Sequence, residues 1–138
     1  MRFGKIVVVL LVLVLSVSLF GNEYREVRNI SLSKDEIKQI LIKYDKYERV
    51  FQFRWTLYKN GGLVIFRSYD RSVAQNILYL NHKNQSFRVV LKPKGRSYSP
   101  PYILVKFVKF DYKKDKADFQ LFLSDDDMQI ELEYLKNR

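Results

Sequence analysis

An alternating run from Glu48 to Asp70, interrupted by Asn60-Gly61, constrains the fold of this chain more than any other stretch. An Asn-Gly pair accepts the positive φ angles of a two-residue type I′ turn, whose twist matches that of the strands on either side. The segment therefore predicts a β-hairpin in which Trp55 faces Phe66. In this register one face is apolar and is expected to face the core; it holds Phe51, Phe53, Trp55, Leu57, Val64 and Phe66.

The first 21 residues have the composition of an export signal. Met1–Lys5 is short and basic, Ile6–Leu15 is an unbroken apolar run, and Ser16–Gly21 supplies small residues suited to peptidase cleavage. We expect a secretory signal peptide over 1–21, cleaved after Gly21, and no membrane span after cleavage. The alternative is an uncleaved membrane anchor, although a span needs about 20 apolar residues and this run is nearer to about 15.

Charge and the absence of cysteine narrow the class of protein. Removal of 1–21 takes away Arg2 and Lys5 but no acidic residue, so the formal net charge falls from +10 to +8. Such a surplus favours anionic surfaces, polysaccharides or acidic proteins as partners, and export argues against nucleic acid. The chain has no cysteine, which excludes disulfides, thiol chemistry and acylation at a cysteine. We expect an exported protein of a bacterial periplasm.

Residues 33–45 are expected to form a short amphipathic helix. Ser33 and Glu36 have the spacing of a capping box. Apolar residues then recur at helical spacing, at Ile37, Ile40, Leu41 and Tyr44. We interpret this segment as a helix that covers part of a sheet and follows an extended lead-in over 22–32. A membrane-surface or partner-binding helix is the alternative.

The rest of the chain predicts strands. Residues 76–80 and 86–92 predict a second hairpin, and 117–123 with 128–134 a last one. Tyr102–Phe110 is almost continuously apolar, so it is either a strand covered on both faces or a strand with a bulge near Lys106. The expected fold is mainly β, with about seven strands over 48–136. It is either an antiparallel β-sandwich or one strongly curled antiparallel sheet, with the N-terminal helix, in a single globular domain over 33–138.

Residues that carry enzyme chemistry do not form a recognisable motif. His82 is the only histidine and is expected in a hairpin loop, as a solvated turn residue. Asp125–Asp127 lacks the glycine and the terminal glutamate of a calcium-binding EF-hand loop, and adjacent acids are typical of a turn. The sequence therefore predicts no enzyme, no metal and no cofactor. A hydrolase with an unrecognised pair of carboxylates is the alternative.

Two basic features are candidates for a binding site. The expected hairpin register places Arg54 directly opposite Arg67, and like charges across two strands are unfavourable unless an anion lies between them. A later loop presents Lys94, Arg96 and Tyr98, and Arg and Tyr are favoured contact residues. The competing interpretations are two arginines that point into solvent or pair with local acids, and a polar loop that only connects two sheets.

The functional expectation is a small exported, non-enzymatic module that binds an anionic envelope component or an acidic protein surface. The candidate ligand-binding residues are Arg54, Arg67, Lys94, Arg96 and Tyr98. The alternative is an accessory or assembly subunit that binds a protein partner through a sheet edge or through the apolar strand Tyr102–Phe110. Exposure of that strand would favour partner binding, whereas burial between sheets would make it part of the core.

Overall fold

The computed structural model describes residues 24–91, 100–126 and 128–138. The predicted signal segment, 1–21, lies outside these residues. Within them the chain is mainly β, and its strands are β1 (Glu26–Ser33), β2 (Lys38–Tyr44), β3 (Tyr47–Lys59), β4 (Gly62–Tyr69), β5 (Ser72–Tyr79), β6 (Ser86–Val90), β7 (Tyr102–Asp111), β8 (Lys116–Ser124) and β9 (Glu131–Tyr134). In this part of the chain, no helix has the length and apolarity needed to cross a membrane.

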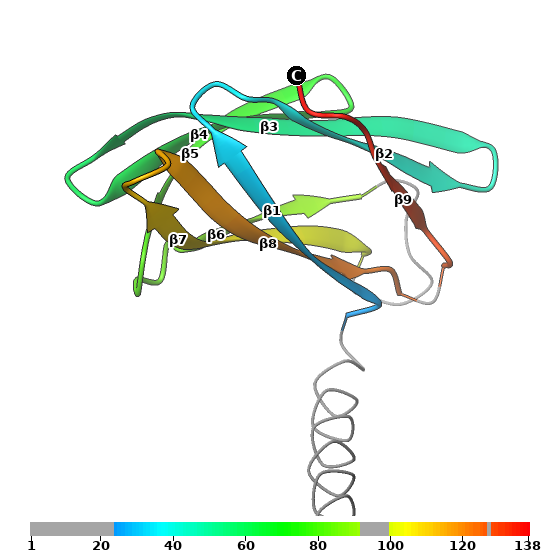
Figure 1. Ribbon diagram of the computed structural model, residues 1–138. Coiled ribbons are helices and arrows are strands. Elements are labelled where there is room, and N and C mark those ends of the chain that lie inside the picture. The colour runs from blue at the N-terminus through cyan, green and yellow to red at the C-terminus, as the bar shows by residue number, and fades with distance from the viewer. Residues whose placement is uncertain (1–23, 92–99, 127) are drawn as a thin grey trace, which may run out of the picture.

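The strands are divided between two antiparallel sheets rather than joined in one curled sheet. Sheet A has the order β1-β8-β7-β6, and sheet B has the order β5-β4-β3-β2-β9. In Figure 1, β2 to β5 form the upper layer, and β6, β7 and β8 form the lower one. β1 and β6 are therefore the edges of sheet A, while β5 and β9 are the edges of sheet B.

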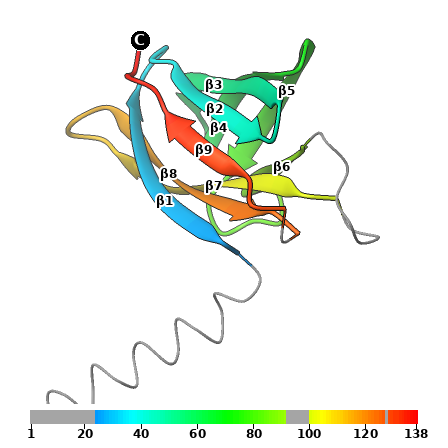
Figure 2. The same ribbon diagram turned by 90° about the vertical axis from the view of Figure 1, so that its right-hand side faces the viewer.

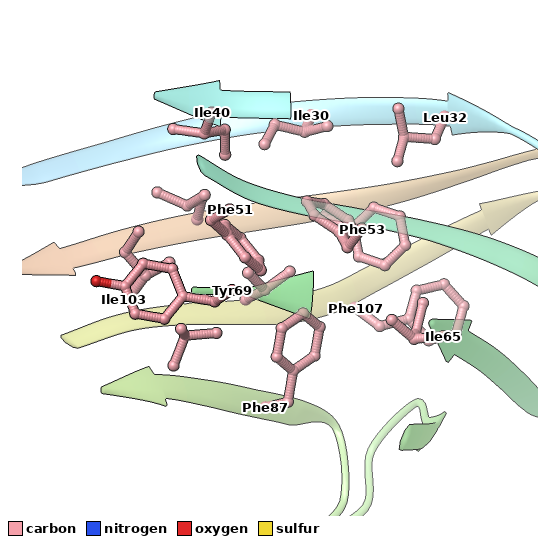
Figure 3. Packing of buried hydrophobic residues seen from close by; sticks show 14 of the residues in the cluster. Ile30, Leu32, Ile40, Phe51, Phe53, Ile65, Tyr69, Phe87, Ile103 and Phe107 are labelled. Carbon is pink, nitrogen blue, oxygen red and sulfur yellow. The ribbon is translucent and has the colours of Figure 1, made fainter. Parts of the chain in front are cut away.

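The inward faces of both sheets contribute to one hydrophobic core. Figure 3 shows the rings of Phe51 and Phe53 from β3 on the side that faces Phe87 of β6. The rings of Phe53 and Phe119, from opposite sheets, meet edge to face with centroids 5.3 Å apart. Because each buried ring removes a large apolar area from water, these contacts between the layers hold the two sheets together.

The turn of the β3–β4 hairpin is confirmed together with the register next to it, in which Leu57 faces Val64, but the register beyond Thr56 is wrong. Asn60-Gly61 forms the two-residue loop, with φ of 54° and 78°. Beyond the turn, a β-bulge at Thr56 shifts the pairing, so that Trp55 faces Ile65 and not Phe66. An extra residue in one strand changes every later partner in the ladder.

Because of the bulge, the predicted core face is also partly wrong. Phe51, Phe53 and Trp55 are buried as expected, but Leu57 is 49% exposed and Phe66 is 37% exposed. Leu63 and Ile65 are fully buried in their place. Alternation continued through Thr56 and around the turn assigns Leu57 on β3 and Phe66 on β4 to the wrong face, because the extra residue reverses which side chains point inward.

The predicted helix over 33–45 is wrong, and the lead-in over 22–32 contains most of β1. The Ser33 amide does donate to a Glu36 carboxylate oxygen at 2.9 Å, but this contact closes a turn in which Asp35 has a φ of 63°. Ile40 and Ile42 are then buried at alternate positions, as in a strand. Their branched side chains favour β structure over a helix.

Two of the predicted hairpins are wrong, because their two strands belong to different sheets and do not pair. β5 and β6, which lie over the pair 76–80 and 86–92, belong to sheets B and A. β8 and β9, which lie over 117–123 and 128–134, are divided in the same way. Alternation still identifies the inward residues correctly, since Phe87, Val89 and Leu91 are all buried. Alternation shows which side chains of a strand point inward, but it does not show which strand lies next to it. The two predicted pairings are wrong for this reason.

The apolar segment Tyr102–Phe110 lies in β7, between β6 and β8. Ile103, Val105 and Phe107 are fully buried. A register shift between Phe107 and Lys109 confirms the bulge that the sequence allowed near Lys106. The segment belongs to the core and does not offer the exposed apolar strand on which one form of partner binding would depend.

Candidate functional site

The bulge at Thr56 separates the two arginines that the sequence places together. Arg54 faces Phe66 across the ladder, and Arg67 faces Phe53. Residues that face each other point to the same side of a sheet, so Arg54 lies on the outer face with exposed Phe66, and Arg67 lies on the inward face with buried Phe53. The predicted Arg54–Arg67 pair is wrong, and of the two only the Arg67 side chain reaches the space between the sheets.

Arg67 is held by contacts from both sheets. Its Nε donates to Oδ1 of Asn76 on β5 at 2.7 Å. Its guanidinium carbon lies 4.9 Å from the centre of the Phe87 ring on β6. Burial lowers the pKa of Arg67 from its ordinary value, because a low-dielectric environment disfavours the charged form. An arginine remains protonated even so, and the half-buried side chain keeps its positive charge.

No carboxylate neutralises Arg67 within the described residues. The ion pairs in this part of the chain are Arg25–Asp125, Lys43–Glu133 and Arg49–Asp70. In the last pair, Oδ1 of Asp70, the acid nearest to Arg67 in the sequence, lies 3.2 Å from Nε of Arg49. A partly buried charge without a counter-ion is unfavourable, so this arrangement suits an anion that a ligand supplies.

A depression of about 280 Å³ opens beside Arg67. It is lined by Arg67, Tyr69, Asp70, Ser72, Arg88, Val89 and Val90, which come from β4, β5, β6 and the turn after β4. Arg88 adds a second cation, and its guanidinium carbon lies 3.9 Å from the centre of the Tyr102 ring. Figure 2 shows β5 and β6 on the same side of the molecule, with β1 on the opposite side. A ligand that approaches from the β5–β6 side therefore meets Arg67 between the sheets and Arg88 on the outward face of sheet A. It also meets the carboxylate of Asp70, which lies beside Arg49.

The opposite side, between β1 and β9, has its cations engaged with partners of the chain itself. The guanidinium carbon of Arg28 lies 3.8 Å from the centre of the Tyr134 ring. Arg25 donates to a carboxylate oxygen of Asp125 at 2.7 Å and reaches the carbonyl of Ile130 at 3.4 Å. On this side Arg25 has an acidic partner and Arg28 packs on an aromatic ring, whereas Arg67 on the β5–β6 side is half-buried and has no acidic partner among the described residues.

Arg54 lines a different depression, of about 410 Å³. Its lining residues are Ile37, Gln52, Phe53, Arg54, Phe66, Arg67, Ser68 and Val73. The side chains of Gln52, Phe66 and Ser68 belong to the outer face of sheet B, where Arg54 is exposed to solvent. An exposed guanidinium is well hydrated and does not need a bound counter-ion.

Lys94, Arg96 and Tyr98 lie outside the described residues. The two ends of their segment are described, and there the amide of Leu91 donates to the carbonyl of Pro101 at 2.8 Å. Val90, one residue earlier, lines the depression beside Arg67. The role of the three candidate residues stays a prediction.

The histidine and the acidic run take part in local contacts. His82 accepts a hydrogen bond from the amide of Asn84 at Nδ1, at 3.1 Å. Asp125 is 8% exposed and is paired with Arg25. Within 24–91, 100–126 and 128–138, no three His, Cys, Asp or Glu side chains lie close enough together to hold a metal ion.

Sequence reasoning missed two residues of the Arg67 site, Asn76 and Arg88. Asn76 stands two residues before buried Leu78, so alternation along β5 was a signal for its inward position. Arg88 alternates with buried Phe87 and Val89 and was recognisable only as an outward residue. Its position beside Arg67 depends on the order of the strands, which alternation does not define.

Comparison with known proteins provides no relative from which a function can be transferred. No protein-family model, no curated protein and no solved structure matches this chain. A function is therefore inferred from the geometry around Arg67.

Proposed function

We propose that this chain is an exported, non-enzymatic β-sandwich module that binds an anionic group of an envelope component or of an acidic protein surface. The group is a carboxylate or a phosphate, which accepts hydrogen bonds from a guanidinium in a planar, charge-assisted arrangement. Its place is beside Arg67, in the depression on the β5–β6 side.

One observation carries the proposal: Arg67 is half-buried and has no acidic partner among the described residues. Its Nε is already bound to Asn76, which orients the guanidinium, and its terminal nitrogens make no hydrogen bond to other described residues. Arg88 lines the same depression and supports the same sign of ligand. The net charge of +10, or +8 after removal of 1–21, adds a general attraction for anions.

The predicted export signal supports the location of the ligand. If residues 1–21 direct the chain across a membrane, the exported chain meets the anionic polymers, lipids and proteins of the envelope. A basic surface raises the rate of encounter with such partners, and a single half-buried arginine adds selectivity for an accessible carboxylate or phosphate.

An NMR titration tests the proposal directly. Inorganic phosphate and acetate are added to the purified chain at about 0.15 M salt, and the Nε–H signals of the arginines are followed. We expect a saturable shift of the Arg67 signal. Arg54, exposed on the other face of the same strand pair, is the internal control. An Arg67 signal that moves no more than the Arg54 signal would overturn the proposal.

Retention on an immobilised polyanion such as heparin gives a second readout. Arg67→Gln and Lys59→Gln each remove one positive charge, and Lys59 is exposed beside the β3–β4 turn. We expect Arg67→Gln to elute at clearly lower salt than Lys59→Gln. Equal elution of the two variants would show that only total charge matters and would count against a defined site at Arg67.

A second candidate function is an accessory subunit that binds a protein through a sheet edge. It is favoured by the composition of β5, an edge strand of eight residues without a charged side chain. Bare edge strands are templates for pairing with another chain.

A further inference from the structure

β5 differs from the other edge strands of the described chain. β6 and β9 have only five and four residues, and they carry Arg88 and a pair of glutamates, respectively. β1 is as long as β5 but contains Glu26 and Arg28. β5, with the sequence SVAQNILY, has no charge and no proline, and these are the features that protect sheet edges from pairing.

Alternate amides of β5 point away from β4. The turn before β5 consists of two residues, 70–71, both with positive φ, so Ser72 belongs to the hydrogen-bonded pair that closes it. Hydrogen-bonded and non-hydrogen-bonded pairs alternate along an antiparallel ladder, which directs the N–H and C=O groups of Val73, Gln75 and Ile77 toward the open edge.

The end of β5 agrees with this assignment. Tyr79 belongs to the same alternate set, and its N–H donates at 3.0 Å to the carbonyl of Asn84, which lies outside sheet B. For Val73, Gln75 and Ile77, no backbone hydrogen bond beyond the β4–β5 ladder occurs among the described residues. Three consecutive alternate positions of β5 are thus available to an added strand.

An added strand would meet two different environments on its two faces. On the outer face it would lie beside Val73 and Ile77, which are 75% and 45% exposed. On the inner face it would lie beside Asn76, which already accepts a hydrogen bond from Arg67. Because side chains alternate along a strand, the best occupant has apolar residues outward and an acidic residue inward, opposite Asn76.

We propose that β5 binds an extended segment of an acidic protein partner as an added strand, whose inward carboxylate pairs with Arg67. The inference rests on the proposed anion site and names its ligand as a Glu or Asp side chain. Charge complementarity selects this occupant over a second copy of the chain, because two copies repel each other whether each carries +10 or, after removal of 1–21, +8. A second β5 would also bring no carboxylate to Arg67.

Two synthetic peptides test the proposal with the full chain. Each has eight residues, blocked ends and one fluorophore; one alternates Val and Glu, and the other alternates Val and Gln. Fluorescence anisotropy at about 0.15 M salt measures their affinities. We expect the Val-Glu peptide to bind about tenfold more tightly, as a charge-assisted contact with Arg67 requires. Equal affinities would overturn the proposed carboxylate contact.

A proline in β5 tests the added strand. Gln75→Pro removes one outward N–H but no hydrogen bond to β4, a position that an edge strand tolerates. We expect it to weaken both peptides by about tenfold, whereas Gln75→Thr, which keeps the N–H, binds them as the wild type does. The emission of buried Trp55 reports whether each variant is folded. Equal binding by folded Gln75→Pro would overturn the proposal.

Hydrogen exchange on the wild type gives a readout that needs no variant. The Val-Glu peptide is expected to slow exchange at the amides of Val73, Gln75 and Ile77, because each gains a hydrogen bond. Unchanged exchange at all three with the peptide bound would place the peptide elsewhere and overturn the proposal.

Arg67→Gln separates the failure of this inference from that of the anion site. We expect this variant to bind both peptides with the affinity of the wild type for Val-Gln, while Arg54→Gln keeps the preference for Glu. If phosphate shifts the Arg67 signal but Gln75→Pro binds both peptides normally, the anion site stands and the added strand is wrong. A dimer that Gln75→Pro abolishes would make the occupant a second copy and overturn the proposal.

Discussion

Trp55 of β3 donates its indole Nε1 hydrogen to the backbone carbonyl of Leu32 in β1 at 2.7 Å. The two residues belong to different sheets, and both are almost completely buried. The bulge at Thr56 keeps Trp55 on the inward face while the strand continues to the turn with the opposite alternation. This hydrogen bond therefore joins the two layers at the position where β3 changes its alternation.

Replacement of Trp55 by Phe should lower the free energy of unfolding by about 1–3 kcal/mol, because the Leu32 carbonyl loses its donor while it remains buried. Urea denaturation followed by circular dichroism measures the change. Leu57→Ala, at an exposed position of the same strand, is the control and should change stability by about 0.5 kcal/mol or less. Equal denaturation midpoints for wild type and Trp55→Phe would contradict the prediction.

Deletion of Thr56 should give a folded protein. Without the bulged residue, Trp55 still faces Ile65 and Leu57 still faces Val64, now in one regular ladder. Deletion of Arg54 is the control, since it moves either Trp55 or both Phe51 and Phe53 to the outer face. Trp55 emission should stay that of a buried indole only in the Thr56 deletion. Unfolding of both deletions would show that the bulge itself is needed.

Tyr134→Phe should leave stability unchanged or raise it. The hydroxyl of Tyr134 is buried and has no hydrogen-bond partner among the described residues, and burial raises its pKa above the ordinary range. Phenylalanine removes this unsatisfied group and keeps the ring that Arg28 covers. Thermal melting measures the effect. A loss of more than about 1 kcal/mol would mean that the hydroxyl has a stabilising partner.

Asp111 should make stability depend on pH in acid. Its carboxylate accepts hydrogen bonds from the amides of Lys114 and Lys113, which lower its pKa below the ordinary value of 3.8, the Lys114 amide most. Because the folded-state pKa is lowered, the stabilisation is complete above the ordinary value and is lost as the pH falls through the folded-state pKa.

Melting temperatures of wild type and Asp111→Asn, measured from about pH 6 to about pH 2, test this dependence. The wild type should be the more stable protein at the higher pH, and the two curves should converge at the lower end. A constant difference across the range would show that ionisation of Asp111 does not contribute.

Much of the fold follows from local pattern, and its failures have local causes. The strand predicted over 117–123 is confirmed, and Phe119, Leu121 and Leu123 are buried at alternate positions because a strand repeats every two residues regardless of its neighbours. The Ser33–Glu36 pair predicted a helix because the same side-chain contact can cap a helix or close a β-turn. The left-handed conformation of Asp35, which turns the chain into β2, has no strong sequence signal.

The candidate site was less accessible to sequence reasoning. Arg67 was singled out for its supposed position opposite Arg54, and the bulge removes that reason while it leaves Arg67 as the better candidate. Its actual neighbours, Asn76 and Phe87, come from β5 and from a strand of the other sheet. Such a combination depends on sheet order and on the crossing from β5 to β6, and neither is encoded in the periodicity of a single strand.

The pairing of β1 with β8 has a consequence for the time course of folding. β2 to β5 form a meander in which each strand pairs with the next. β1 instead pairs with β8, which lies near the other end of the chain, so it cannot pair until β8 is present. Contacts so distant in sequence form slowly, and we expect closure of sheet A to limit the folding rate. During the proposed export, the first strand to cross the membrane would expose Ile30 and Leu32 until almost the last residues had followed. A chaperone that shields β1 over this interval would shorten the period in which the chain can aggregate.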